Sequence, residues 1–215
     1  MDRMTWLKEM RRVCEEQYDW RWGLYSNRSH LQFLQAFINL LPSNGKVLDA
    51  ACGAGRYIPT LLEQGHTVLG IDQSLGMLVR AQEGFPEVLF EKIGLQEMAF
   101  ESVFDGAICM DAMENVPPED WPVVLGNFNR ALKAGGYLYF TSETIENADE
   151  GEIRQAFEKA QAAGLPVVYG EWPDEHVYHF HPTNQRAMGW VEGAGFEILK
   201  VGDGDGYHHM LVRKG

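Results

Sequence analysis

A glycine loop followed at a distance by an acid is the clearest chemical pattern in the sequence. Residues 46–51 (KVLDAA) have the composition of a buried strand, and the loop 52–55 follows them before a helix begins. Gly53 and Gly55 permit positive φ angles and close approach of a ligand to bare backbone, and the first N–H groups of the helix point at the same place. Asp72 ends the next predicted strand, about 20 residues after Asp49, where an acid can accept hydrogen bonds from both hydroxyls of a ribose. The pattern therefore indicates a site for a nucleoside-containing cofactor.

The residues around the loop distinguish between two kinds of cofactor. A nicotinamide dinucleotide would require the pattern G-x-G-x-x-G, but Ile58 stands where the third glycine belongs. Asp49 lies just before the turn, where its carboxylate would repel a pyrophosphate and attract the ammonium group of an amino-acid moiety. A nicotinamide-dependent oxidoreductase is therefore the weaker alternative.

Several segments resemble, in the right order, the motifs of class I S-adenosylmethionine-dependent methyltransferases. They are 47–56 (VLDAACGAGR), 68–74 (VLGIDQS), 104–113 (FDGAICMDAM), 132–140 (LKAGGYLYF) and 193–198 (GAGFEI). The resemblance implies S-adenosylmethionine as the cofactor and S-adenosylhomocysteine as its product. It also implies methyl transfer by in-line displacement to a small-molecule acceptor.

Carried over position by position, the resemblance implies contacts to each part of the cofactor. The methionine part would contact Asp49, Ala51, Gly53 and Gly55. Asp72 would bind the ribose, and the adenine would lie against Gln73, Leu95, Gln96 and Met110. Relatives often carry an acid at the start of the loop after the third strand. This sequence has Ile93-Gly-Leu-Gln-Glu97 there, so we expect Gln96 to take the place of that acid.

The residues that would hold the methyl acceptor are less clearly marked. In the resembling family the acceptor lies after the fourth strand, where this sequence has Asp111, Glu114 and Asn115; helix capping is their alternative role. Trp22 and Tyr25 belong to an aromatic N-terminal stretch. These rings would either cover the sulfonium, since aromatic faces attract cations, or simply pack a helix against the sheet.

Two histidines are candidates for proton transfer. His179 and His181 share one face of a predicted strand, beside Tyr178, and either line the substrate pocket or lie on the surface. No metal site is expected, because no carboxylate stands at ligand spacing from the pair. A general base is needed only when the nucleophile starts protonated, so the catalytic residue is left open among His179, His181 and Asp111.

Strand and helix signals alternate along the chain, which is typical of a mainly parallel sheet. We expect an α/β fold: a three-layer Rossmann-like sandwich with a seven-stranded, mostly parallel sheet and an antiparallel last strand. A single domain, 1–215, would carry an N-terminal helical cap at about 1–42 and an insertion at about 142–182 over the active site. Ser29 is predicted to cap the helix 29–41, and Gly135-Gly136 to close the helix before the fifth strand.

The composition argues against some partners. With a formal net charge of −13, the protein would repel nucleic-acid phosphates, so a small molecule is the expected acceptor. No run of 18 apolar residues and no signal sequence is found, so we expect a cytoplasmic protein without a membrane span. Cys14, Cys52 and Cys109 are too sparse for a disulfide framework. We expect a monomer or homodimer; a non-catalytic, S-adenosylmethionine-binding regulatory protein is the second alternative.

Overall fold

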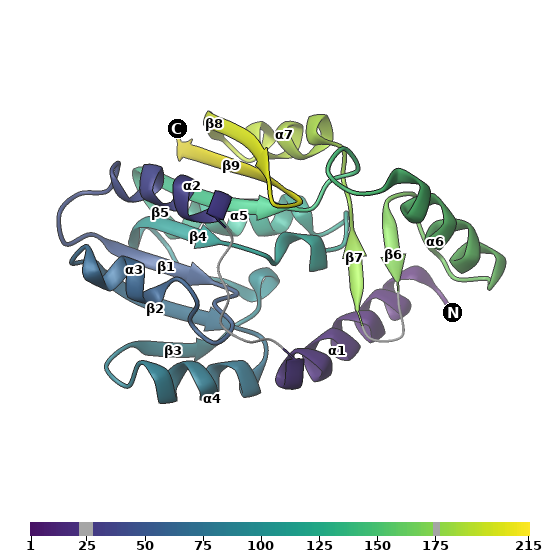
Figure 1. Cartoon of the computed structure of the whole chain (residues 1–215), viewed down its shortest axis with the longest axis horizontal. Helices are drawn as coiled ribbons and strands as arrows, with labels where there is room; N and C mark the ends of the chain where they lie inside the picture. The colour runs from purple at the N-terminus through teal and green to yellow at the C-terminus, as the bar shows by residue number, and fades with distance from the viewer. Residues whose placement is uncertain (22–27, 174–176) are drawn as a thin grey trace.

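A seven-stranded sheet forms the centre of the computed structural model, which describes residues 1–21, 28–173 and 177–215 (Figure 1). The strand order is β3-β2-β1-β4-β5-β9-β8. All neighbours from β3 to β5 pair in parallel, whereas β9 pairs antiparallel with both β5 and β8. The strands are β1 Lys46–Ala50, β2 Thr67–Asp72, β3 Leu89–Lys92, β4 Phe104–Cys109, β5 Leu132–Ser142, β8 Phe196–Gly204 and β9 Tyr207–Lys214. The expected α/β fold, with its antiparallel last strand, is confirmed.

Helices cover both faces of this sheet. The helices that the structure describes are α1 Arg3–Arg21, α2 Arg28–Ile38, α3 Ile58–Glu63, α4 Leu75–Gly84, α5 Trp121–Ala131, α6 Glu150–Ala162 and α7 Asn184–Gly193, with short 3₁₀ turns η1 Leu95–Glu97 and η2 Met113–Asn115. Neighbouring strand residues point to opposite faces, so each central strand contributes to two apolar layers. Val47 packs in the layer with α2 and α3, and the adjacent Leu48 packs in the layer with α5 and α7. Among the described residues, no helix has the length and hydropathy needed to cross a bilayer.

Two local predictions were wrong at element boundaries. Helix α2 begins at Arg28, so Ser29 lies inside its first turn, and the Ser29 hydroxyl donates to Asp205 in the β8–β9 turn at 2.6 Å. Helix α5 ends at Ala131, so the pair Gly135-Gly136 lies within β5 and does not close the helix. A Cβ on Gly136 would lie 3.1 Å from the carbonyl oxygen of Asp105, which explains a glycine where β5 crosses close to β4.

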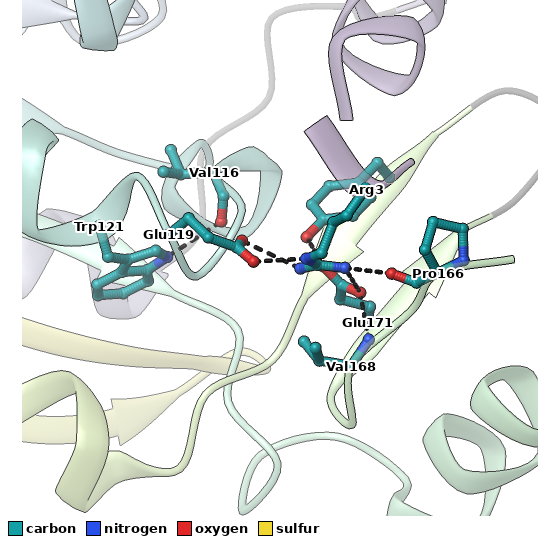
Figure 2. A network of polar contacts seen from close by, with 8 residues as sticks. Arg3, Val116, Glu119, Trp121, Pro166, Val168 and Glu171 are labelled. Carbon is teal, nitrogen blue, oxygen red and sulfur yellow. Dashed lines mark hydrogen bonds and ion pairs between the residues drawn. The ribbon is translucent and has the colours of Figure 1, made fainter. Parts of the chain in front are cut away.

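The segment between β5 and α7 contains α6 and a small antiparallel pair, β6 Glu171–Pro173 and β7 Tyr178–Phe180. Figure 1 shows this segment and α1 beyond the ends of β1 and β2. A polar network joins the two (Figure 2). The Arg3 guanidinium donates to the fully buried Glu171 at 2.6 and 3.0 Å, to the carbonyl of Pro166 at 2.6 Å, and to Glu119. Buried ion pairs of this kind are costly to break, so the network fixes the first turn of α1 against the segment.

Candidate active site

A cavity of about 380 Å³ opens where the central parallel strands end. The loops after β1, β2, β3, β4 and β5 all contribute to its lining, together with β7, β9 and one side of α1. Ligand sites in open α/β sheets lie at this edge of the sheet. Of the nine residues predicted to contact the cofactor, all but Gly55 line the cavity: Asp49, Ala51, Gly53, Asp72, Gln73, Leu95, Gln96 and Met110.

The glycine loop is tightly folded against the second strand. Ala51, Gly53 and Gly55 all have positive φ, at 55°, 54° and 86°. The N–H of Cys52 donates to the carbonyl of Ile71 at 3.0 Å. Gly55 is needed for packing, since a Cβ there would lie 2.7 Å from the Phe85 ring. The loop therefore presents bare backbone to the cavity at Gly53, while Gly55 makes room for the Phe85 ring at the end of α4.

Asp72 holds the loop in this shape. One carboxylate oxygen accepts the Gly53 N–H at 2.9 Å, and the other accepts the Ser74 N–H at 2.8 Å. An ionised carboxylate offers about four lone-pair sites, so each oxygen can accept more than one hydrogen bond. Asp72 thus positions the glycine loop as well as lining the cavity.

Asp49 is the most unusual group in this part of the site. Its side chain is 3% exposed, and its Oδ2 has no hydrogen-bond partner among the described residues. Burial, reinforced by Asp72 and opposed by Arg56, raises the pKa of Asp49 to about 7. A buried carboxylate oxygen without a donor, beside bare loop backbone, fits the ammonium group of the expected cofactor.

Helix α1 and two polar side chains shape the end of the cavity where the adenine is expected. Arg11 of α1 donates to the Gln73 side chain at 3.2 Å and pairs with Glu97 at 2.5 and 2.7 Å. The Gln96 amide donates to Asp120 at 3.2 Å, and Asp120 also lines the cavity. An acid is therefore present at this end, but it comes from the start of α5, where the sequence pattern did not place it.

Five side chains, which we call the acceptor wall, line the opposite part of the cavity: Asp111, Glu114, Glu143, His179 and Tyr207. Asp111 has a φ of 60°, and its N–H donates to the Thr141 hydroxyl at 2.8 Å. Its carboxylate accepts from Arg56 at 2.9 Å and from the hydroxyl of Tyr207. Burial, together with Asp111 and Glu143, raises the pKa of Glu114 well above its usual range. Asn115 also lines the cavity, and its side-chain nitrogen has no hydrogen-bond partner among the described residues.

The two predicted histidines meet at Glu143. The Nδ1 atom of His179 lies 3.0 Å from Glu143 Oε2, and the Nε2 atom of His181 lies 3.1 Å from the same oxygen. Burial opposes ionisation of Glu143, but the contacts with both histidines outweigh it and lower its pKa to about 2. Glu143 is the carboxylate partner that sequence spacing did not reveal, because it follows β5 while the histidines lie on and after β7.

Other predicted acceptor residues are placed differently. Tyr178 touches the cavity, but its hydroxyl donates to Glu171 at 2.5 Å. His181 does not line the cavity and is 3% exposed. Trp22 and Tyr25 lie outside the described residues. The sequence analysis missed Arg56, Glu143 and Tyr207; only Arg56, directly after the glycine loop, stands where a motif could have indicated it.

Comparisons with known proteins identify methyltransferases as relatives of this chain. A sequence model of a family described as a methyltransferase domain matches residues 47–136. YqeM of Bacillus subtilis, described as a methyltransferase, is 35% identical over 194 residues, which cover 75% of this chain and 77% of that protein. The ubiquinone biosynthesis O-methyltransferase of Methylococcus capsulatus is 32% identical over 122 residues, or 54% of this chain. The match spans 50% of the length of that relative.

A solved structure has a similar fold over almost the whole chain. It is the 1,6-didemethyltoxoflavin-N1-methyltransferase of Burkholderia thailandensis, with bound 1,6-didemethyltoxoflavin and S-adenosylhomocysteine. The TM-score is 0.67 at 18% identity, over 98% of this chain and 88% of the other. At this identity the likeness concerns the fold alone.

Proposed function

Since this chain belongs to the class I S-adenosylmethionine-dependent methyltransferases, we propose that it transfers a methyl group from S-adenosylmethionine to a small-molecule acceptor. The observation that carries the proposal is the buried Asp49, whose Oδ2 has no donor among the described residues and lies beside the glycine loop. A cavity of about 380 Å³ suits small ligands. The formal net charge of −13 would repel an anionic polymer such as a nucleic acid.

The chain's own residues bind and align the reactants. Asp49 would pair with the ammonium group, Asp72 would accept hydrogen bonds from the ribose, and the Gly53 backbone would fit against the methionine part. When bound, the cofactor supplies a methyl group that its sulfonium already activates. Alignment of two reactants can lower the barrier of such a reaction by about 7–11 kcal/mol, so positioning and exclusion of water can supply much of the rate enhancement.

The acceptor would lie against the acceptor wall. Asp111 is engaged by Arg56 and Tyr207, so we assign it a positioning role and do not propose it as the base. His179 is the candidate that faces the cavity, and His181 acts only through Glu143. A protonated acceptor would lose its proton at this wall, and positioning alone suffices for an acceptor that has none.

Calorimetry with S-adenosylhomocysteine and S-adenosylmethionine tests the cofactor. We expect one binding site per chain. The proposal would be overturned if neither compound binds. A change in NADH fluorescence on mixing would instead support the oxidoreductase. Formation of S-adenosylhomocysteine in the presence of a panel of small hydroxyl, amine, thiol and carbon acceptors then separates an enzyme from a non-catalytic binding protein. We expect at least one acceptor to give turnover above the hydrolytic background.

A further inference from the structure

The cluster of Glu143, His179 and His181 has a geometry that the proposed methyl transfer does not require. One ligand atom from each side chain lies within 4.8 Å of the other two. Two imidazoles and one carboxylate are the donor set that proteins use for zinc and related divalent transition metals. We propose that these three residues bind one divalent transition-metal ion at the edge of the acceptor wall.

The spacing of the donor atoms is close to that of a metal centre. Both histidine nitrogens approach the same oxygen of Glu143, at 3.0 and 3.1 Å. Two ligands of a tetrahedral zinc ion, each about 2.0–2.1 Å from the metal, lie about 3.3 Å apart. Small side-chain movements therefore suffice to place all three atoms around one ion.

The hydrogen bonding of His181 supplies an independent reason. Its Nδ1 lies 3.2 Å from the carbonyl oxygen of Gly170, and its Nε2 faces the carboxylate of Glu143. Both partners are acceptors, and a neutral imidazole has only one N–H to donate. When Nδ1 donates to Gly170, the Nε2 of a neutral His181 has no proton to offer Glu143, and a metal ion between the two atoms would bind both. Metal-binding histidines usually donate their second ring nitrogen to a backbone carbonyl in this way.

The backbone at Gly170 is built to make this contact. Gly170 has a φ of 98°, and a Cβ there would lie 2.6 Å from the carbonyl oxygen of His181. The Gly170 carbonyl also accepts the backbone N–H of His181 at 2.8 Å. The histidine ring is therefore held from behind, with its Nε2 fixed toward Glu143.

The position of the cluster suggests what the ion would do. Glu143 and His179 line the cavity, whereas His181 is buried behind them, so the remaining coordination positions would face the acceptor. A metal ion polarises a bound oxygen or lowers the pKa of a bound hydroxyl. The use of the ion to hold an oxygen-bearing acceptor rests on the proposed function, but the binding of the ion does not.

Metal titration of the chelator-treated protein tests the site. We expect one Zn²⁺ per chain by calorimetry, and one Co²⁺ with the visible absorption bands of a site with nitrogen and oxygen ligands. Glu143→Gln and His179→Ala should each weaken binding at least 100-fold. His208→Ala is the matched control, because His208 pairs with Asp203 at 2.7 Å in a different histidine–acid contact; it should leave metal affinity within threefold of the wild type.

S-adenosylhomocysteine binding is measured on the same samples. Retained S-adenosylhomocysteine binding shows that each variant is folded. Absence of this binding in the wild-type protein would count against the proposed function and not against the metal site. Absence of saturable Zn²⁺ and Co²⁺ binding by the wild-type protein would overturn the metal proposal. Equal affinity in the wild type and in Glu143→Gln would overturn it as well.

Discussion

The two sides of the cavity are held together in different ways. At the cofactor end, Asp72 bonds to Gly53 and Ser74, which are 19 and 2 residues away along the chain. At the acceptor wall, Asp111 bonds to Arg56 and Tyr207, which are 55 and 96 residues away, and Glu143 meets His181 at a separation of 38. The glycine loop with Asp72 is a compact motif of neighbouring segments, whereas the acceptor wall exists only after the sheet has brought distant strand ends together.

This difference predicts separable effects. Changes at the cofactor end should alter cofactor affinity directly, because the loop and its anchoring acid form one unit. Changes at the acceptor wall should alter the stability of contacts between distant segments and leave the cofactor loop intact. The predictions below test that separation.

Asp72→Ala should have the largest effect. It removes the groups that would accept hydrogen bonds from the ribose and releases the Gly53 N–H. Hydrogen bonds to a charged group contribute about 1.5–3 kcal/mol each, so S-adenosylhomocysteine affinity should fall at least about 100-fold in calorimetry. Glu91→Ala, an exposed acid on neighbouring β3, is the control and should change affinity less than twofold. Near-normal affinity in a folded Asp72→Ala protein would contradict the ribose assignment.

Tyr207→Phe should affect the other side alone. It leaves the half-buried Asp111 carboxylate without one of its donors, which should lower the free energy of unfolding by about 2 kcal/mol in urea denaturation. S-adenosylhomocysteine affinity should remain within threefold. Tyr169→Phe is the control, since its hydroxyl contacts the exposed Glu150 at 3.3 Å, and it should cost less than about 0.5 kcal/mol. A large loss of cofactor affinity in Tyr207→Phe would show that the two sides are not separable.

We expect Asp49 to make cofactor binding depend on pH. Its pKa is raised to about 7, so near pH 7 roughly half of the unliganded molecules carry a proton there. Pairing with an ammonium group favours the ionised form. Binding should therefore release up to about half a proton at pH 7, and affinity should rise as pH increases from 6 to 7, by at most about tenfold. Calorimetry in two buffers of different ionisation enthalpy measures the release, and Asp49→Asn should abolish it.

The same shift has a defined sign for stability. The native, unliganded protein holds a proton on Asp49 between about pH 4 and pH 7, where the unfolded chain does not. The contribution of this group to stability is therefore greatest at low pH and is lost as pH rises through 7. Asp49→Asn should remove this component from the pH dependence of urea denaturation.

Arg11→Ala should have the smallest effect. Arg11 orients Gln73 at the adenine end, but its pair with Glu97 is exposed, and such pairs contribute about 0.2–1 kcal/mol. S-adenosylhomocysteine affinity should fall about two- to fivefold at low salt and less at high salt. Arg12→Ala, on the same helix and paired with Glu9 and Glu16 away from the cavity, should not change affinity. Equal effects of the two variants would exclude a role for the contact between Arg11 and Gln73 in cofactor binding.

The sequence predicted the two sides of the cavity unequally for the same physical reason. The glycine loop and Asp72 are close in sequence and require particular residue types, so their pattern is readable without a fold. The partnership of Glu143 with His179 depends on where β5 ends and how β6 pairs with β7, and no spacing rule encodes that. Arg3 likewise gave no signal, although its contact with the buried Glu171 fixes α1 beside the cavity.

Local signals also failed where tertiary contacts took over the residue. Ser29 has the side chain of a helix cap, but its hydroxyl and N–H both bond to Asp205 of the β8–β9 turn. Gly135-Gly136 has the composition of a helix end, but the close approach of β5 to β4 uses the second glycine. In each case the sequence correctly indicated a residue with a particular structural role, but it assigned that role to the wrong element.

The backbone of Asp111 sets a rule for redesigning the choice of acceptor. Its φ of 60° is tolerated by glycine, asparagine and aspartate and is strained for most other residues. Most substitutions at position 111 would therefore add about 1–2 kcal/mol of backbone strain to the loss of the contacts with Arg56 and Tyr207. Libraries at Glu114 and His179, whose backbones carry no such restriction, could vary the recognised molecule while Asp111 keeps its contacts with Arg56 and Tyr207.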